Sequence, residues 1–173
     1  QSVFPSYVTN TIVEKSAWIV PGQGESRWSP DSLFDYTMAS GHFTYKLSKF
    51  SDIQFGAGKN FIGDGYRSMI LSDIAFNYPF LRVQTKAGIF QYTNLYMEHM
   101  DLISNPSEEF AYDKKYMTLH HLSANITNRL NVGIFESIIW ENTRTPDLSG
   151  FDIAYLNPII FLRPVEFSFN SSD

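Results

Sequence analysis

The chain has 173 residues, of which 18% are charged and 16% aromatic, and its 13 basic and 18 acidic residues give a net charge of -5. That length suits one ordinary domain, and the acidic balance makes nucleic acid an unexpected partner. The absence of cysteine excludes disulfides, thiolate metal sites and a cysteine nucleophile. No apolar run of about 18 residues is present, which excludes a transmembrane helix, whereas a transmembrane barrel needs strands of only ~10 residues.

The first third of the chain alternates loop and strand signals. Residues 1–10 place apolar side chains around Pro5, which is typical of a strand end or an edge strand. Residues 11–33 scatter Pro21, Gly22, Gly24 and Pro30 among polar residues, and this composition predicts a long surface loop. A β-like pattern follows over 34–47, and its parity slips near Ser40-Gly41, which indicates a bulge or a bend.

The remaining segments read as hairpins. Residues 53–58 place apolar Ile53, Phe55 and Ala57 on one face and polar or small residues on the other. The clearest hairpin spans 80–99 and turns at Ala87-Gly88. Two further strand-like runs meet near 125–129, and residues 151–169 form a last β-rich run interrupted by prolines. The pattern predicts an all-β chain with about seven or eight strands in a single unit over 1–173.

Loop lengths are sorted along the chain. Short links near 48–51, 87–88 and 126–129 alternate with long loops near 11–33, 59–79, 99–113 and 142–150. An outer-membrane barrel has short periplasmic turns and longer outer loops, and aromatic residues at its strand ends form girdles. The same aromatic residues would equally suit the core of a soluble sandwich or small barrel, so the pattern leaves both architectures open.

Five ordered segments resemble a known family. FGAGKNFIGDGYRSMILSD, NYPFLRV, FQYTNLY, LSANITNRLNVGIFES and YLNPIIFLRPVEFS are similar to Bacteroidota outer-membrane proteins grouped with the capsule-assembly Wzi family, including gliding-motility proteins. The resemblance implies an antiparallel transmembrane β-barrel in the bacterial outer membrane. It also implies that 1–173 is a portion of a larger barrel, which contacts outer-membrane lipid, surface polysaccharide or other outer-membrane and motility proteins.

The stretch 53–79 concentrates the special residues of the chain. Its glycines, Gly56, Gly58, Gly63 and Gly65, match neither a dinucleotide fingerprint nor a P-loop, because Phe61 and Asp64 occupy positions that those motifs reserve for glycine and lysine. We therefore expect them to end a strand and to form a turn with positive φ. No nucleotide or other cofactor is expected.

Five residues of this stretch form the candidate binding surface for a saccharide: Asp64, Tyr66, Arg67, Asp73 and Asn77. Acidic and amide side chains beside an aromatic ring suit sugar hydroxyls. The alternative is that Arg67 pairs with Asp64 or Asp73 as a clamp, so that the loop folds over the barrel mouth as a plug.

Catalytic and metal sites are not expected. His120 and His121 are adjacent on a strand and point to opposite faces, so they would not ligate one ion together. No Gly-x-Ser-x-Gly elbow marks a hydrolase nucleophile. The leading hypothesis is a non-enzymatic outer-membrane barrel acting in polysaccharide or capsule association, or in a gliding-motility or adhesion assembly; the alternative is a soluble β-sandwich or small-barrel carbohydrate-binding module.

Overall fold

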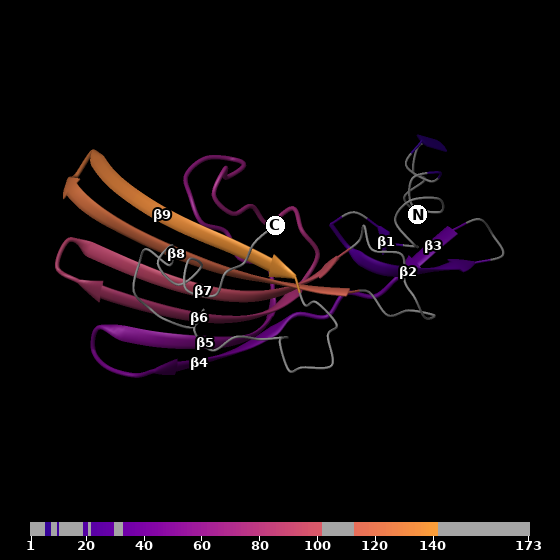
Figure 1. Ribbon diagram of the computed structural model, residues 1–173, viewed down its shortest axis with the longest axis horizontal. Coiled ribbons are helices and arrows are strands. Elements are labelled where there is room, and N and C mark those ends of the chain that lie inside the picture. The colour runs from indigo at the N-terminus through magenta and orange to yellow at the C-terminus, as the bar shows by residue number, and fades with distance from the viewer. Residues whose placement is uncertain are drawn as a thin grey trace. The chain divides into compact units, whose positions relative to one another are not determined.

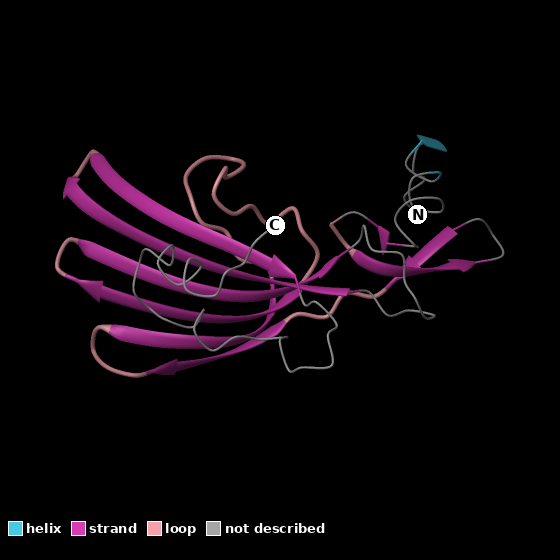
Figure 2. Ribbon diagram, viewed as in Figure 1, coloured by secondary structure: helices cyan, strands magenta, loops and turns pink. Residues whose placement is uncertain are grey.

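A computed structural model of the chain describes residues 6–7, 10, 19–20, 22–29, 33–101 and 113–141. Figure 2 shows the strands in magenta and a helical piece at residues 6–7 and 10. All elements with assigned bounds are strands, which confirms the all-β prediction. The contacts within the chain define two compact units. Gln1–Gly41, Ala57–Tyr78 and Asp101–Tyr112 make up the first unit, and His42–Gly56, Pro79–Met100 and Asp113–Asp173 make up the second.

The first unit contains a small antiparallel sheet. Its strands are β1 (Ile19–Val20), β2 (Gly24–Ser29) and β3 (Leu33–Tyr36), in the order β1-β2-β3. Gly22 forms the β1–β2 turn with a φ of 75°. Two of these strands lie inside the range 11–33, which the sequence predicted as one long loop. Because GESRWS has few apolar side chains and lies between glycine and proline, its pattern hid a strand that pairs on both edges.

A six-stranded antiparallel sheet contains the other strands. These are β4 (Gly41–Lys46), β5 (Ser51–Gly58), β6 (Tyr78–Ala87), β7 (Phe90–Asp101), β8 (Asp113–Thr127) and β9 (Leu130–Glu141). Each strand pairs with the next along the chain, so the sheet is a meander (Figure 1). The sheet is not closed, and β4 and β9 are its edges.

The connections within this sheet are of two kinds. Residues 47–50, 88–89 and 128–129 make the short turns, in the places where the sequence predicted them. Residues 59–77 join β5 to β6 as a long loop, and β7 ends 12 positions before β8 begins, at Asp101 and Asp113. The expected loop near 142–150 and the β-rich run over 151–169 lie outside the described residues. Short turns and long connections therefore alternate along the described meander.

The pattern over 34–47 belongs to two strands in different sheets. β3 ends at Tyr36 and β4 begins at Gly41, so the parity slip near Ser40-Gly41 marks a break between sheets and not a bulge within one strand. The four residues between them have no regular structure. Only the pairing partners, β2 for β3 and β5 for β4, distinguish this break from a bulge, and the pattern within 34–47 does not contain that information.

The register defines the two faces of the sheet. Arg82 lies opposite Leu95, and Gln84 lies opposite Thr93, so these side chains share what we call the Arg82 face. Val83 lies opposite Asn94 on the other face. Since Asn94 bonds to His120 of β8, we call this the His120 face.

Polar and apolar side chains are unevenly distributed between the faces. On the Arg82 face, the three consecutive pairs Arg82–Leu95, Gln84–Thr93 and Lys86–Gln91 contain one apolar residue. On the His120 face, β8 and β9 bring together mostly large apolar and aromatic side chains: Tyr116–Trp140, Thr118–Ile138, His120–Glu136, Leu122–Ile134 and Ala124–Val132.

In this sheet, some polar side chains are buried and some large apolar side chains are exposed, which is the reverse of the usual pattern in a water-soluble domain. Gln54 and Thr93 on the Arg82 face are 8% and 3% exposed, while Phe55 on the opposite side of β5 is 64% exposed. The Arg82 face also buries an apolar group, made of Phe80, Leu95, Met97 and Leu119. The sheet therefore buries polar groups while leaving large apolar side chains accessible.

Candidate functional site

The loop 59–77 between β5 and β6 closes on itself through a short neck. Ile62 N–H donates to Leu71 O at 3.0 Å, and Leu71 N–H donates to Ile62 O at 3.3 Å. These two bonds make an isolated antiparallel bridge. Residues 63–70, which we call the tip, are held between them, so the tip is a compact loop whose ends meet.

Ser68 fixes the neck from inside the tip. Its hydroxyl donates to Ile62 O and accepts bonds from Ile70 N–H at 2.9 Å and Leu71 N–H at 3.3 Å. Gly63 passes directly beside it, with a φ of 130°. A Cβ at Gly63 would collide with Ser68 Oγ and lie 3.0 Å from its Cβ. Both glycine requirements expected for this turn are confirmed, because Gly65 also has a positive φ of 94°.

The base of the loop is attached to the rest of the first unit at two points. Lys59 Nζ donates to Gly22 O in the β1–β2 turn at 2.9 Å. At the other end, Asn77 Nδ2 donates to Ala39 O at 2.6 Å. Backbone carbonyls accept both bonds, so the loop is positioned by the main chain of its neighbours.

A third attachment is buried. Asn60 is 4% exposed, and its N–H donates to the hydroxyl of Tyr78, itself 2% exposed, at 3.0 Å. Asn60 and Tyr78 lie at the two ends of the loop, so this bond joins the start of the loop to its return into β6. The loop is therefore built as a fixed structure at its base.

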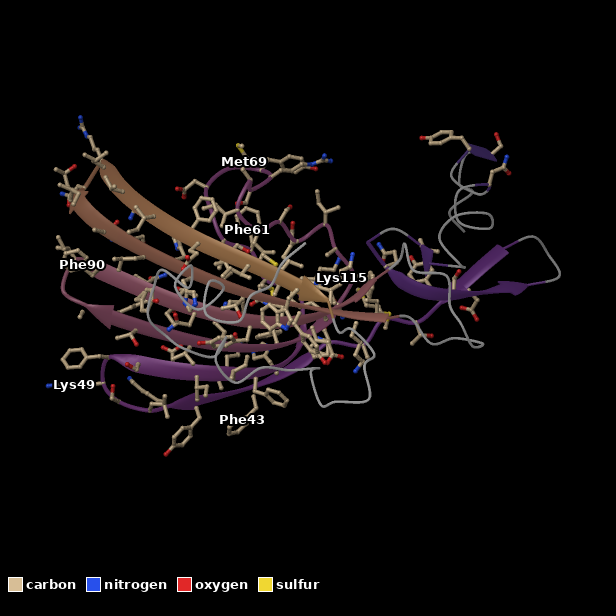
Figure 3. All side chains as sticks on the ribbon, viewed as in Figure 1. Phe43, Lys49, Phe61, Met69, Phe90 and Lys115 are labelled. Atoms are coloured by element: carbon tan, nitrogen blue, oxygen red, sulfur yellow. The ribbon has the colours of Figure 1, made fainter. Side chains whose placement is uncertain are left out.

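The tip presents an aromatic ring and a cation to the exterior. Tyr66 is 90% exposed and Met69 is fully exposed, and Figure 3 shows Met69 at the outer end of the loop, with Phe61 nearer its base. The Arg67 guanidinium carbon lies 5.6 Å from the centre of the Tyr66 ring. That geometry is a cation–π contact, which pre-orients the guanidinium without occupying its hydrogen-bond donors.

The structure separates the five predicted site residues by role. Tyr66 and Arg67 form the contact just described, and Asp64 is exposed in the Gly63–Gly65 turn beside them. Asp73 is exposed in the loop after the neck, and Asn77 holds Ala39. Within the described loop, no ion pair joins Arg67 to Asp64 or Asp73. The clamp that the sequence offered as an alternative is therefore not formed.

A second polar group, on the His120 face, was not predicted as a unit. His120 is fully buried, and its Nδ1 lies 2.6 Å from Asn94 Oδ1 and 3.3 Å from the Tyr92 hydroxyl. Since Asn94 Oδ1 only accepts, Nδ1 carries the proton of that bond. The Tyr92 ring is stacked on the imidazole, and Tyr96 meets it edge-on, each with centroids 6.3 Å apart.

The strand register shows whether the adjacent residues His120 and His121 lie on the same face of the sheet. His120 lies opposite Glu136 and His121 opposite Phe135, on different faces of the sheet, as predicted. In the portion of the chain that the structure describes, no group of three or more His, Asp and Glu side chains is arranged to hold a metal ion. The His120 group would have been found from sequence only with the β7–β8 register in hand.

Comparisons with known proteins do not assign the chain to a family. No family model matches the chain, and neither a curated protein nor a solved structure matches it. Among the described residues, no helix has the length and apolar character needed to cross a membrane. The resemblance to the Wzi family therefore stays a prediction.

Proposed function

We propose that the chain is a portion of an outer-membrane β-barrel that acts at the cell surface, in polysaccharide or capsule association or in a gliding-motility or adhesion assembly. The barrel would be of the Wzi-like type, similar within that group to the gliding-motility protein RemB. Its strands would contact outer-membrane lipid through the His120 face, and its long loops would meet polysaccharide or partner proteins.

The observation that carries this proposal is the exposure of large apolar side chains on the His120 face. Phe55, Phe90, Val132 and Ile134 are each about half exposed or more on this face. Exposed apolar surface of this kind is unfavourable in water and is stable in hydrocarbon. The Tyr116–Trp140 ring pair, with centroids 5.8 Å apart, lies near the ends of β8 and β9 away from their short turn. This position is where an interfacial girdle would lie.

The edge strand β9 supports the view that the sheet continues. It is 12 residues long and exposes Leu130, Val132, Ile134, Phe135 and Ile139. A long apolar strand at the edge of a sheet is prone to non-specific pairing. Addition of further strands beside β9 would cover this edge of the described sheet, as in a larger barrel.

The polar group on the His120 face is compatible with an apolar surrounding. A polar side chain in a membrane span is stable only when other groups of the protein satisfy it. Asn94 and His120 bond to each other, and the Tyr92 and Tyr96 rings cover the imidazole. These contacts reduce the cost of placing the group against lipid, although His120 Nε2 is buried without a hydrogen-bond partner among the described residues.

In this proposal the tip of loop 59–77 is the contact point for surface polysaccharide. Tyr66 offers a flat ring for a sugar face, and Asp64 and Arg67 offer an acceptor and several donors for hydroxyl groups beside it. Their exposure suits recognition of an extended chain in place of a small enclosed ligand. Asp73 and Asn77, at the base of the loop, have supporting positions.

Single-cysteine labelling tests the membrane placement, because the natural chain contains no cysteine. Phe55→Cys and Ile134→Cys on the His120 face are compared with Gln54→Cys and Gln84→Cys on the other face, after reconstitution of the full chain in lipid vesicles. A lipid-facing surface predicts slow reaction with a charged maleimide and blue-shifted emission of an environment-sensitive label at positions 55 and 134 only. Equal labelling of both faces, or a soluble monomer without detergent, would exclude the proposal.

Variants of the tip test the polysaccharide contact. Tyr66→Ala and Arg67→Gln are expected to weaken binding of the full chain to isolated cell-surface polysaccharide, while their thermal unfolding stays within about 0.5 kcal/mol of the natural chain because both side chains are exposed. Lys49→Gln, an exposed cation in the β4–β5 turn, is the matched control. Unchanged binding in both tip variants would remove the tip from the site.

The alternative function is a soluble β-sandwich or small-barrel carbohydrate-binding module. It is favoured by one observation, the buried apolar group Phe80, Leu95, Met97 and Leu119 on the Arg82 face, which would serve as the core between two sheets. The labelling experiment separates the two functions. A sandwich predicts protection of the Arg82 face in water and no dependence on lipid.

A further inference from the structure

Among the described residues, the Arg82 face contains a cation without a matching anion. Arg82 is half-buried, and its Nε is shielded from solvent without a hydrogen-bond partner among the described residues. A guanidinium keeps its charge at any physiological pH and carries five donors. Leaving such a group partly buried and uncompensated is costly, so an acceptor on this face would be bound favourably.

No carboxylate of the neighbouring strand positions fills this role. Within the paired part of β6 and β7, the residues that share this face are neutral or basic: Phe80, Arg82, Gln84, Lys86, Gln91, Thr93, Leu95 and Met97. On β5 the nearest carboxylate is Asp52, and no ion pair joins it to Arg82 in the described residues. On the opposite face, Glu98 pairs with Lys114 at 2.7 Å. The chain as a whole is acidic, but the surroundings of Arg82 on this face contain no carboxylate that pairs with it among the described residues.

Two glutamines and a threonine occupy register positions near Arg82 on the same face. Ser51 Oγ and Thr85 Oγ1 lie 2.9 Å apart across β5 and β6. Continuing that antiparallel pairing by three residues brings Gln54 level with Arg82, on the opposite face from Ser51 and Thr85. On the other side, Gln84 Nε2 donates to Thr93 Oγ1 at 3.3 Å, which leaves the Gln84 carbonyl oxygen as an acceptor.

We propose that Arg82, with Gln54 and Gln84 beside it, forms a binding site for the carboxylate group of an acidic saccharide. The guanidinium would bind the planar carboxylate through two parallel N–H···O bonds. The Gln84 carbonyl oxygen, on a half-buried side chain, would accept a bond from a hydroxyl group of the same sugar ring, while the buried Gln54 lines the site. The register positions next to Arg82 are neutral, and a single guanidinium among them suits a singly charged carboxylate better than a phosphate, which attracts several cations. This inference rests on the proposed association with polysaccharide, but it does not depend on the membrane placement.

The test measures binding of fluorescently labelled oligogalacturonate to the full chain in detergent at low ionic strength. Neutral maltohexaose with the same label is the ligand control. We expect the natural chain to prefer the acidic oligosaccharide, and Arg82→Gln to weaken its binding about tenfold to a hundredfold, which is the effect of one charge-assisted interaction. Lys49→Gln, which removes an exposed cation in the β4–β5 turn outside both proposed sites, is the matched control and should retain the preference.

Two further measurements keep the outcome decisive. Arg82→Lys retains the charge without the bidentate geometry, so it should bind with intermediate affinity; it replaces Arg82→Gln if that variant does not fold. Inorganic phosphate is titrated as a competitor. The proposal is wrong if the acidic and neutral oligosaccharides bind equally, if Arg82→Gln binds as the natural chain does, or if phosphate alone binds as tightly through Arg82.

The result also separates this site from the tip. Loss of binding in Tyr66→Ala and Arg67→Gln with full retention in Arg82→Gln would support the proposed function and overturn the Arg82 site. The reverse pattern would support the Arg82 site and overturn the role of the tip.

Discussion

Gly63→Ala is expected to open the neck of loop 59–77. An alanine at a φ of 130° costs about 1–3 kcal/mol in backbone strain. Its Cβ would also displace Ser68, whose hydroxyl accepts bonds from Ile70 N–H and Leu71 N–H. Losing these two bonds adds about 2 kcal/mol, at ~1 kcal/mol each.

The matched control is Gly65→Ala. Gly65 also has a positive φ, of 94°, but no atom lies within 4 Å of a Cβ placed there. This substitution therefore carries the strain without the displacement of Ser68. The difference between the two variants isolates the neck, and about 2 kcal/mol corresponds to a roughly thirtyfold difference in local opening.

Hydrogen–deuterium exchange of the full chain measures this opening at the Ile62 and Leu71 amides, which close the neck. Exchange in Gly63→Ala should be faster than in Gly65→Ala by that factor, while exchange in β7 and β8 is the same in both. If both variants exchange equally at these amides, the neck does not depend on Ser68 and the reasoning is refuted.

Three other substitutions have definite expected effects. Tyr78→Phe removes the acceptor of the buried Asn60 N–H, so thermal unfolding should show a loss of about 1–3 kcal/mol; an unchanged midpoint would contradict the bond. Asn94→Leu leaves the His120 Nδ1–H without its 2.6 Å partner, and a similar loss is expected in denaturant unfolding, most of it recovered when position 120 is also made leucine. Gly88→Ala, at a φ of 59° with open space around it, should cost about 1 kcal/mol, and Gly88→Asn less, because asparagine tolerates this conformation; equal costs would argue against strain as the cause.

The β6–β7 hairpin shows what the sequence predicts well. Alternation on both sides of Ala87-Gly88 placed the turn within one residue of its position, because hairpin pairing is local and Gly88 supplies the positive φ that the turn needs. The strands β1 and β2 were missed for the opposite reason. β1 has only two residues and β2 is mostly polar, so neither shows the alternation that marks a strand, although both pair with the next strand along the chain.

The candidate site was predictable in part. The glycine-rich stretch located the loop, and the positive φ angles at Gly63 and Gly65 follow from residue type. The role of Ser68 was not predictable, since its hydroxyl reaches Ile62, six residues away, only after the loop closes. Arg67 stacks on its neighbour Tyr66 instead of pairing with a carboxylate, and sequence proximity alone does not distinguish these contacts.

Because the neck is closed, the sequence of the tip can change without disturbing the rest of the loop. Its conformation depends on Gly63, Ser68 and two backbone bonds, while the side chains at positions 64, 66, 67 and 69 face outward. Sequence change at these four positions therefore carries little folding cost. The loop can diversify in what it contacts, or accept an inserted epitope, while the strands on either side of it keep their pairing.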